Sequence, residues 1–220
     1  STSVDDSFTI ELFANFDDLS VPAGTTNRRA VMAAQAEVPW EASQFSWAFV
    51  VEMSGGWNAG RGQSQPRELE LFLSNGADFE LVPSGIFIED NVDYFLSASF
   101  DVQDTARFYV ENLESNDVMR AEVQHSRSSL NPDSVFNVFA PYSFAYFDGV
   151  IDEVRFSRGV LDESDLLINT VPEPSSGILL VSSITAMLGL RRRVTQPSEP
   201  MLVMPLHRWK NPTNDTSKYN

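Results

Sequence analysis

Cysteine is absent from this sequence of 220 residues, and histidine occurs only twice, at His125 and His207. Without cysteine the chain has no disulfides, no thiolate metal ligands and no Cys nucleophile. Two histidines are too few for a His-rich transition-metal site within one chain. The fold must therefore depend on its hydrophobic core, and a chain of this length is long enough to bury one.

Lysine is missing from most of the chain, and the first one is Lys210. Residues 1–170 contain nine Arg against 28 Asp and Glu, a formal charge of −19, whereas residues 171–220 contain six Lys and Arg against three acids, or +3. An acidic body without lysine argues against nucleic acid as a partner, because phosphate contacts need Lys and Arg. It is typical of a solvated surface and compatible with divalent cations.

Long segments with helical periodicity are also missing from this acidic body, in which apolar residues recur with a period near two. Turn-forming residues separate these runs at 74–76, 82–85, 89–91 and 131–133. Many short strands with polar turns predict two packed antiparallel sheets, a sandwich or jelly roll. The predicted strands are residues 8–13, 45–52, 68–73, 79–82, 94–100, 107–110 and 150–156.

One short helix is predicted at residues 161–167. Asp162 is placed as its N-cap, with Asp165 three positions further on in the place of the Glu or Gln of a capping box.

The character of the chain changes at Val171, where a Pro-rich stretch can continue neither a helix nor a central strand. Residues 177–190 carry no charge and are apolar or small, which predicts an apolar helix. The basic cluster that follows supplies a stop-transfer signal and, by the positive-inside rule, a cytoplasmic end. We expect residues 194–220 to be disordered. The residues that define this pattern are Pro172, Glu173, Pro174, Arg191, Arg192 and Arg193.

This segment, residues 171–193, resembles the PEP-CTERM sorting signal of Gram-negative bacteria, which has a Pro-Glu-Pro motif, a short apolar helix and a basic cluster in that order. The resemblance implies recognition by an exosortase, transient anchoring in the inner membrane, and export to the cell surface or extracellular matrix. Such signals usually end at the basic cluster, whereas this chain runs 27 residues further.

Residues 1–168 are similar to the laminin-G-like, concanavalin A-like lectin and glucanase superfamily. The similarity is carried by residues 147–156 with 161–166, which look like the closing strand and short helix, and by residues 7–12, which look like an early strand. It implies an all-β antiparallel jelly-roll sandwich. The first strand of the family normally lies some 20 residues earlier, so we expect a truncated N-terminus and an exposed edge beside the closing strand.

The first candidate site is the Gly-rich loop 54–62, which contains Trp57, Asn58 and Arg61. A tryptophan can stack on the apolar face of a sugar while Asn and Arg donate hydrogen bonds to hydroxyls. The alternative is an ordinary hairpin loop with Trp57 folded onto the sheet edge. The loop is not a phosphate loop, because no Gly-Lys-Ser/Thr ends it.

The second candidate is a Ca²⁺ site at Asp148, Asp152 and Glu153, since hard oxygen ligands suit this ion. The favoured alternative is a bend assisted by Gly149, with the acids bonded to backbone amides.

Glu68 and Glu70 lie on one face of a predicted strand, as the paired carboxylates of glycosidases do. Leu69 and Phe72 break the glucanase pattern, and the favoured alternative is a solvated outer face. No nucleophile motif accompanies His125, which is predicted at the surface.

The sequence thus predicts a surface-retained module that binds a polysaccharide or another envelope polymer. No catalytic residue is assigned, and Ca²⁺ is the only candidate cofactor. The alternatives are a glucanase-type module and a passive matrix protein.

Overall fold

A computed structural model describes residues 7–21, 28–36, 45–54, 64–131, 136–138 and 147–170. All of them belong to the first of the two units into which the chain divides, Ser1–Pro172 and Glu173–Asn220. The sorting-signal residues, including Pro172, Glu173, Pro174 and Arg191 to Arg193, lie outside the described residues. Within the described part of the chain, no helix is long and apolar enough to cross a membrane.

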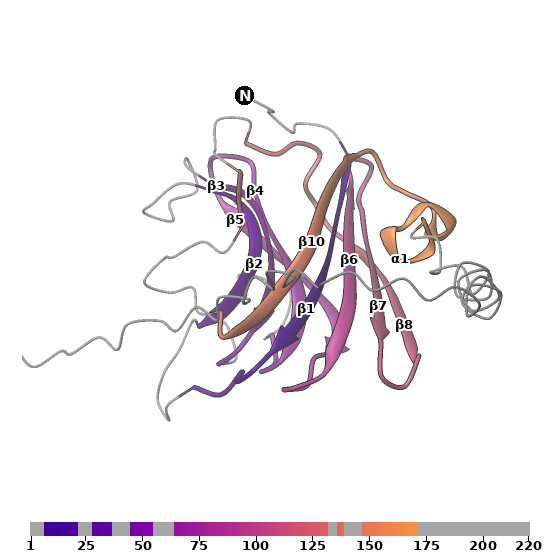
Figure 1. The fold of residues 1–220 in the computed structure, drawn as a ribbon. Coiled ribbons are helices and arrows are strands. Elements are labelled where there is room, and N and C mark those ends of the chain that lie inside the picture. The colour runs from indigo at the N-terminus through magenta and orange to yellow at the C-terminus, as the bar shows by residue number, and fades with distance from the viewer. Residues whose placement is uncertain are drawn as a thin grey trace, which may run out of the picture. The chain divides into compact units, whose positions relative to one another are not determined.

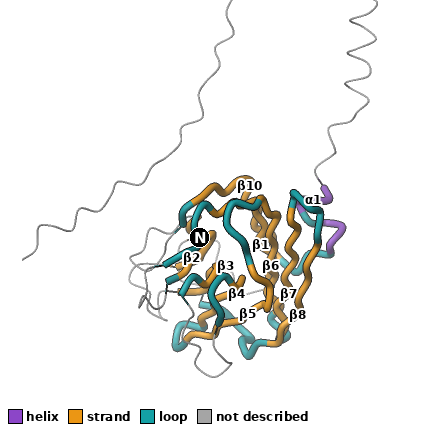
Figure 2. Tube along the Cα trace, turned by 90° about the horizontal axis from the view of Figure 1, so that it is seen from below, coloured by secondary structure: helices purple, strands orange, loops and turns teal. Residues whose placement is uncertain are grey.

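The described residues form two antiparallel sheets, which pack as a sandwich (Figures 1 and 2). The first sheet has the order β10-β1-β6-β7-β8 and the second the order β5-β4-β3-β2-β9. The strands are β1 (Phe8–Phe16), β2 (Arg29–Ala36), β3 (Phe45–Glu52), β4 (Glu68–Ser74), β5 (Phe79–Phe87), β6 (Asp93–Asp101), β7 (Thr105–Asn112), β8 (Val118–Gln124), β9 (Phe136–Val138) and β10 (Gly149–Arg158). The predicted all-β sandwich is confirmed.

Aromatic and aliphatic side chains from the facing sides of the two sheets form the main core. Phe8 of β1 and Trp47 of β3 meet across the sandwich with ring centroids 4.8 Å apart, and both are fully buried. The indole of Trp47 donates a hydrogen bond to Gln35 at 3.1 Å, which satisfies its only polar atom. Burial of such large rings supplies most of the driving force for a fold without disulfides.

Strand β10 pairs along β1 and stands at the edge of the first sheet. Its first residue, Gly149, has φ +148°, and a Cβ there would lie 2.0 Å from the carbonyl oxygen of Asn15. Only glycine allows the two backbones to approach this closely. The closing segment and the early strand of the sequence resemblance are therefore direct neighbours.

Seven of the ten strands that the described residues form contain a predicted run, but β2, β8 and β9 were not predicted. The turn predicted at 82–85 is wrong, because β5 continues through it to Phe87. Gly85 adopts φ +74°, and the pairing with β4 shifts between Glu68 and Glu70, so an irregularity takes the place of a turn.

The predicted short helix is a 3₁₀ turn, Glu163–Asp165, followed by the one-turn helix α1 (Leu167–Thr170). Asp162 does occupy the N-cap position, but its side chain makes no capping hydrogen bond. The turn is held instead by contacts of its neighbours with the sheet, described below.

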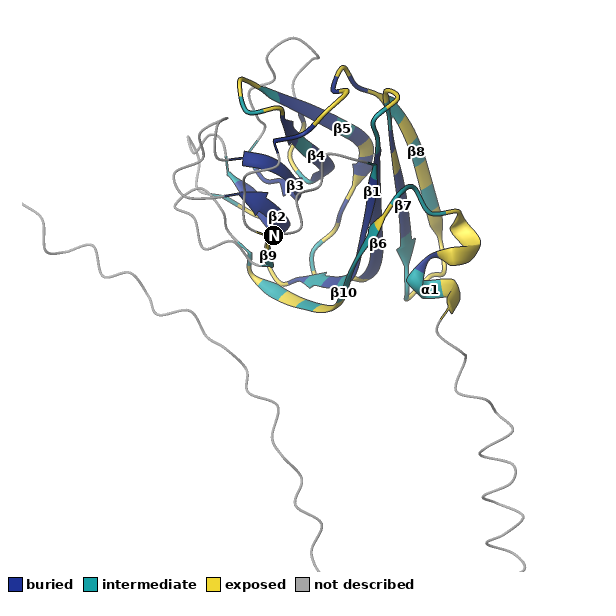
Figure 3. Cartoon of the chain, turned by 90° about the horizontal axis from the view of Figure 1, so that it is seen from above, coloured by how far each residue is buried: buried dark blue, intermediate teal, exposed yellow. Residues whose placement is uncertain are grey.

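The outer face of the second sheet is buried, as Figure 3 shows for β2 to β4. The predicted solvated position of Glu68 and Glu70 is therefore wrong: they are 6% and 0% exposed. Glu68 accepts hydrogen bonds from the amides of Gln65 at 2.9 Å and Gly85 at 2.8 Å. His125 was also wrongly predicted at the surface; its ring is buried and stacks on Phe100 at 4.7 Å.

Candidate functional site

A pocket of about 230 Å³ opens between the outer face of the first sheet and the segment that follows β10. Residues at alternate positions of a strand point to the same face, so the floor is built from cross-strand rows. Pairing of β1, β6, β7 and β8 aligns two such rows. They are Thr9, Ser99, Arg107 and Glu122, and beside them Glu11, Ser97, Tyr109 and Arg120.

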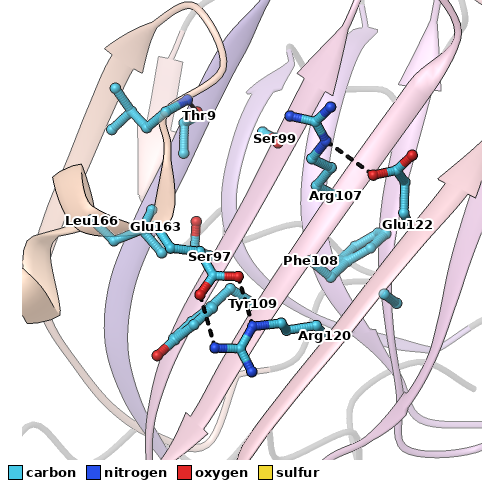
Figure 4. A pocket seen from close by; sticks show the side chains of 12 residues that line it. Thr9, Ser97, Ser99, Arg107, Phe108, Tyr109, Arg120, Glu122, Glu163 and Leu166 are labelled. Carbon is cyan, nitrogen blue, oxygen red and sulfur yellow. Dashed lines mark hydrogen bonds and ion pairs between the residues drawn. The ribbon is translucent and has the colours of Figure 1, made fainter.

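Two arginine–glutamate pairs lie in the pocket (Figure 4). Arg107 of β7 contacts Glu122 of β8 with Nε–Oε2 at 3.2 Å. Arg120 of β8 forms a bidentate pair with Glu163 of the 3₁₀ turn, at 2.6 and 2.8 Å. The two cations balance the two anions, so these pairs leave the pocket neutral within a strongly acidic body.

Tyr109 forms a rigid part of the floor. The guanidinium carbon of Arg120 lies 5.1 Å from its ring centroid, a cation–π contact, and its hydroxyl donates to Glu111 at 2.9 Å. Burial and this hydrogen bond raise the pKa of Tyr109 to about 12, so the phenol stays protonated at neutral pH. The hydrogen bonds from Arg120 hold the pKa of Glu163 below its ordinary value, which keeps that pair charged.

Residues 159–170, called the C-terminal strap below, close one side of the pocket. Thr9 fixes the beginning of the strap, because its Oγ1 donates to the Gly159 carbonyl at 2.9 Å and accepts from the Leu161 amide at 3.0 Å. Glu11 fixes the helix, because its Oε1 accepts from the Leu167 amide at 2.6 Å. The strap is therefore bonded directly to the side chains of β1.

Arg155 of β10 holds the middle of the strap. Its Nε donates to Oε2 of the fully buried Glu11 at 2.6 Å, and its Nη2 donates to the Asp165 carbonyl at 2.6 Å. Leu166 adds an apolar contact, since it is buried in a cluster with Phe95 and Tyr109. These contacts fix the position of Glu163 opposite Arg120.

The sugar-binding residues predicted from the sequence, Trp57, Asn58 and Arg61, lie outside the described residues. Their role stays a prediction.

The three predicted calcium ligands lie in the described part of the chain. Among the described residues, no group of three or more acidic or histidine side chains is placed to hold a metal ion. Asp148 uses its carbonyl to accept the Asp17 amide at 2.9 Å, and the Asp152 carboxylate accepts the Glu153 amide at 2.9 Å. Of the three carboxylates, the one of Asp152 bonds to a backbone amide as the alternative expects, while Gly149 lies in strand β10 rather than at a bend. Calcium binding stays a prediction.

The sequence did not reveal this pocket. Ser97, Ser99, Arg107 and Tyr109 occupy alternate positions of predicted strands, which is a signal for a shared face. Strand β8, which contributes Arg120 and Glu122, was not predicted. Without the register between strands, the two rows could not be assembled.

The chain matches no protein-family model and no curated protein sequence. Solved structures similar to it include the LG1-3 region of the laminin alpha2 chain, with 13% identity, a TM-score of 0.45, and coverage of 70% of this chain and 27% of that one. Another is the enzymatically active domain of tailspike protein 2 from bacteriophage CBA120, with 12% identity, a TM-score of 0.47, and coverage of 77% and 25%. This chain thus spans about a quarter of the length of each of these two.

A SAP-like pentraxin from Limulus polyphemus is also similar, with 9% identity, a TM-score of 0.40, and coverage of 78% of this chain and 71% of that one. The similarity concerns the arrangement of strands. It assigns neither a ligand nor an activity to this chain.

Proposed function

We propose that the chain is an exported, lectin-like module that binds a polysaccharide of the cell envelope or matrix. The observation that carries this proposal is the pocket beside the C-terminal strap. It combines Arg–Glu pairs, serine hydroxyls and the apolar side chains of Leu161 and Leu166. Sugar rings have an apolar face and a rim of hydroxyls, and this mixture of groups suits them.

We infer binding without turnover. The two carboxyl groups on one strand, Glu68 and Glu70, are buried, and Glu68 is bonded to two backbone amides. A glycosidase needs two carboxyl groups that both reach the scissile bond. Release of reducing sugars from laminarin or agarose by the full chain would contradict this inference.

A glycan array with the purified full chain tests the binding proposal. We expect retention on at least one polysaccharide, and a loss of about tenfold or more in affinity for Arg120→Gln, which breaks the bidentate pair with Glu163. Arg158→Gln is the matched control, because Arg158 is an exposed arginine of β10 outside the pocket. An array without signal for plant, algal or bacterial glycans, with and without Ca²⁺, would overturn the proposal.

Export is proposed from the resemblance of residues 171–193 to an exosortase signal. The expected result in a Gram-negative host is surface release of the chain, which is abolished when Pro172, Glu173 and Pro174 are replaced by alanine. Replacement of Pro197 and Pro200, which lie beyond the basic cluster, is the control. Unchanged release after the first substitution would refute the sorting role.

A further inference from the structure

Two serine hydroxyls in the pocket have no hydrogen-bond partner within the described part of the chain. Ser97 and Ser99 of β6 are 4% and 6% exposed and both line the pocket. Among the described residues, neither hydroxyl donates or accepts a hydrogen bond, whereas Thr9 in the same row makes two. Neither oxygen is among the described side-chain atoms that are fully buried without a partner, so both hydroxyls open into the pocket, where a ligand can pair them.

The guanidinium of Arg107 has hydrogen-bond donors that its described neighbours do not accept from. Its Nε contacts Glu122, but its two Nη groups have no partner among the described residues. Residue pairing places Arg107 opposite Ser99, and the next row places Ser97 opposite Tyr109. Free guanidinium donors and free hydroxyls therefore lie side by side on β6 and β7, as far as the described residues show (Figure 4).

Glu122 adds an acceptor to this set. Its Oε2 faces Arg107 at 3.2 Å, while its Oε1 has no partner among the described residues, and the side chain is 61% exposed. Each hydroxyl of a sugar both donates and accepts, so a pair of neighbouring hydroxyls can accept from Arg107 and donate to Glu122. Ser97 and Ser99 can serve in either direction.

The charges favour an uncharged ligand. A carboxylate bound to Arg107 would lie close to the Glu122 carboxylate, which already contacts the same guanidinium, and the two would repel each other. The formal charge of −19 on residues 1–170 opposes approach of any polyanion. A neutral sugar is repelled neither by the Glu122 carboxylate nor by the net negative charge.

The geometry points to a subsite, formed by Ser97, Ser99, Arg107 and Glu122, that binds a vicinal diol of an uncharged sugar residue. This inference rests on the proposed polysaccharide binding and restricts the ligand to polysaccharides built from uncharged sugars. The pocket of about 230 Å³ is smaller than the ~300–1,000 Å³ typical of sites for drug-sized ligands, so it accommodates one sugar residue of a longer chain.

The test compares three kinds of glycan on the full chain by calorimetry: neutral hexose polymers, the same polymers after periodate oxidation, and uronic acid or sialylated glycans. Periodate cleaves vicinal diols and leaves most of the polymer intact. The expected result is binding to a neutral polymer that is lost after oxidation.

Ser97→Ala and Ser99→Ala should each weaken this binding about three- to tenfold, the range for one hydrogen bond. Their melting temperatures should stay nearly level, because each substitution removes a hydroxyl that opens into the pocket and has no partner among the described residues. Ser157→Ala is the matched control, since Ser157 stands opposite Thr9 on β10 but does not line the pocket.

The outcomes separate the two proposals. Binding restricted to acidic glycans would overturn the diol subsite and leave polysaccharide binding standing. Neutral binding that survives both serine substitutions or periodate oxidation would also overturn the subsite. A chain that binds no glycan would overturn both.

Discussion

At the residue scale, the buried carboxyl of Glu70 has a consequence for stability. Both of its oxygens are buried and have no hydrogen-bond partner within the described part of the chain. Burial is the main cause that raises the pKa of Glu70 to about 8, and the nearby Glu52 and Glu68 carboxylates raise it further. The Ser64 hydroxyl and Arg29 lower this pKa in part. The Ser64 hydroxyl makes no hydrogen bond to the Glu70 carboxyl in this structure. Glu70 is therefore mostly protonated at pH 7.

This environment predicts a pH-dependent free energy of unfolding. The folded state holds the Glu70 proton up to about pH 8, whereas the unfolded chain releases it near pH 4.5. The folded state thus binds more protons between these values, and its stability falls as pH rises by up to about 1.4 kcal/mol per pH unit. Glu70→Gln should remove this slope, so the variant is more stable than the parent at pH 7.5 and similar to it near pH 4.5. Urea unfolding at both pH values measures the difference.

Glu68→Gln is the control for Glu70→Gln, because the Glu68 carboxylate accepts two backbone amides. It should lower the free energy of unfolding at pH 7.5 by about 1–3 kcal/mol. If Glu70→Gln destabilised the chain at pH 7.5 as Glu68→Gln does, the protonated state of Glu70 would be refuted.

At the element scale, the sequence revealed strands wherever β-forming residues and alternation coincide. Residues 45–52 were predicted and β3 has the same bounds. Strand β2, with the sequence RAVMAAQA, was missed because alanine has low β-propensity, yet it is buried on both faces between β3 and β9. Tertiary burial decides such strands, and it cannot be read from local propensity.

The burial and the neighbours of individual polar residues were harder to predict than the positions of the strands. Alternation correctly indicated that Glu68 and Glu70 share a face, but it could not show that this face is buried. Likewise, Ser97 and Ser99 share a face in any strand, whereas their neighbours Arg107 and Glu122 depend on the pairing of three strands. A candidate site made by register is therefore visible only in the folded chain.

The C-terminal strap yields a prediction about a whole segment. Glu11 links the strap to β1 through Arg155 and the Leu167 amide, both at 2.6 Å. Glu11→Gln replaces one acceptor with an NH₂ group that must face one of these donors. We expect hydrogen exchange of the amides in residues 161–170 to become at least about tenfold faster, while amides of β3 keep their protection. Equal acceleration in both segments would show global destabilisation and contradict the local role of Glu11.

At the scale of the whole molecule, the dominant quantity is the charge of −19 on residues 1–170. Net charge of one sign destabilises a compact state by self-repulsion, and salt screens it over about 8–10 Å at physiological ionic strength. The exposed ion pairs Arg107–Glu122 and Arg120–Glu163 weaken with salt, but exposed pairs contribute little to stability. The gain in stability from screening the net charge should therefore exceed the loss from weakened ion pairs.

The expected result is a melting temperature that rises by about 2–6 °C between 10 and 150 mM NaCl at pH 7.5, the shift that corresponds to roughly 1–2 kcal/mol for a chain of this size. The same change of salt near pH 4.5 should have a much smaller effect, because the carboxylates take up protons and the net charge falls. KCl at equal ionic strength should reproduce the NaCl result if screening is the cause. A melting temperature that falls with salt at pH 7.5 would mean that the ion pairs around the pocket and strap outweigh the repulsion of the acidic surface.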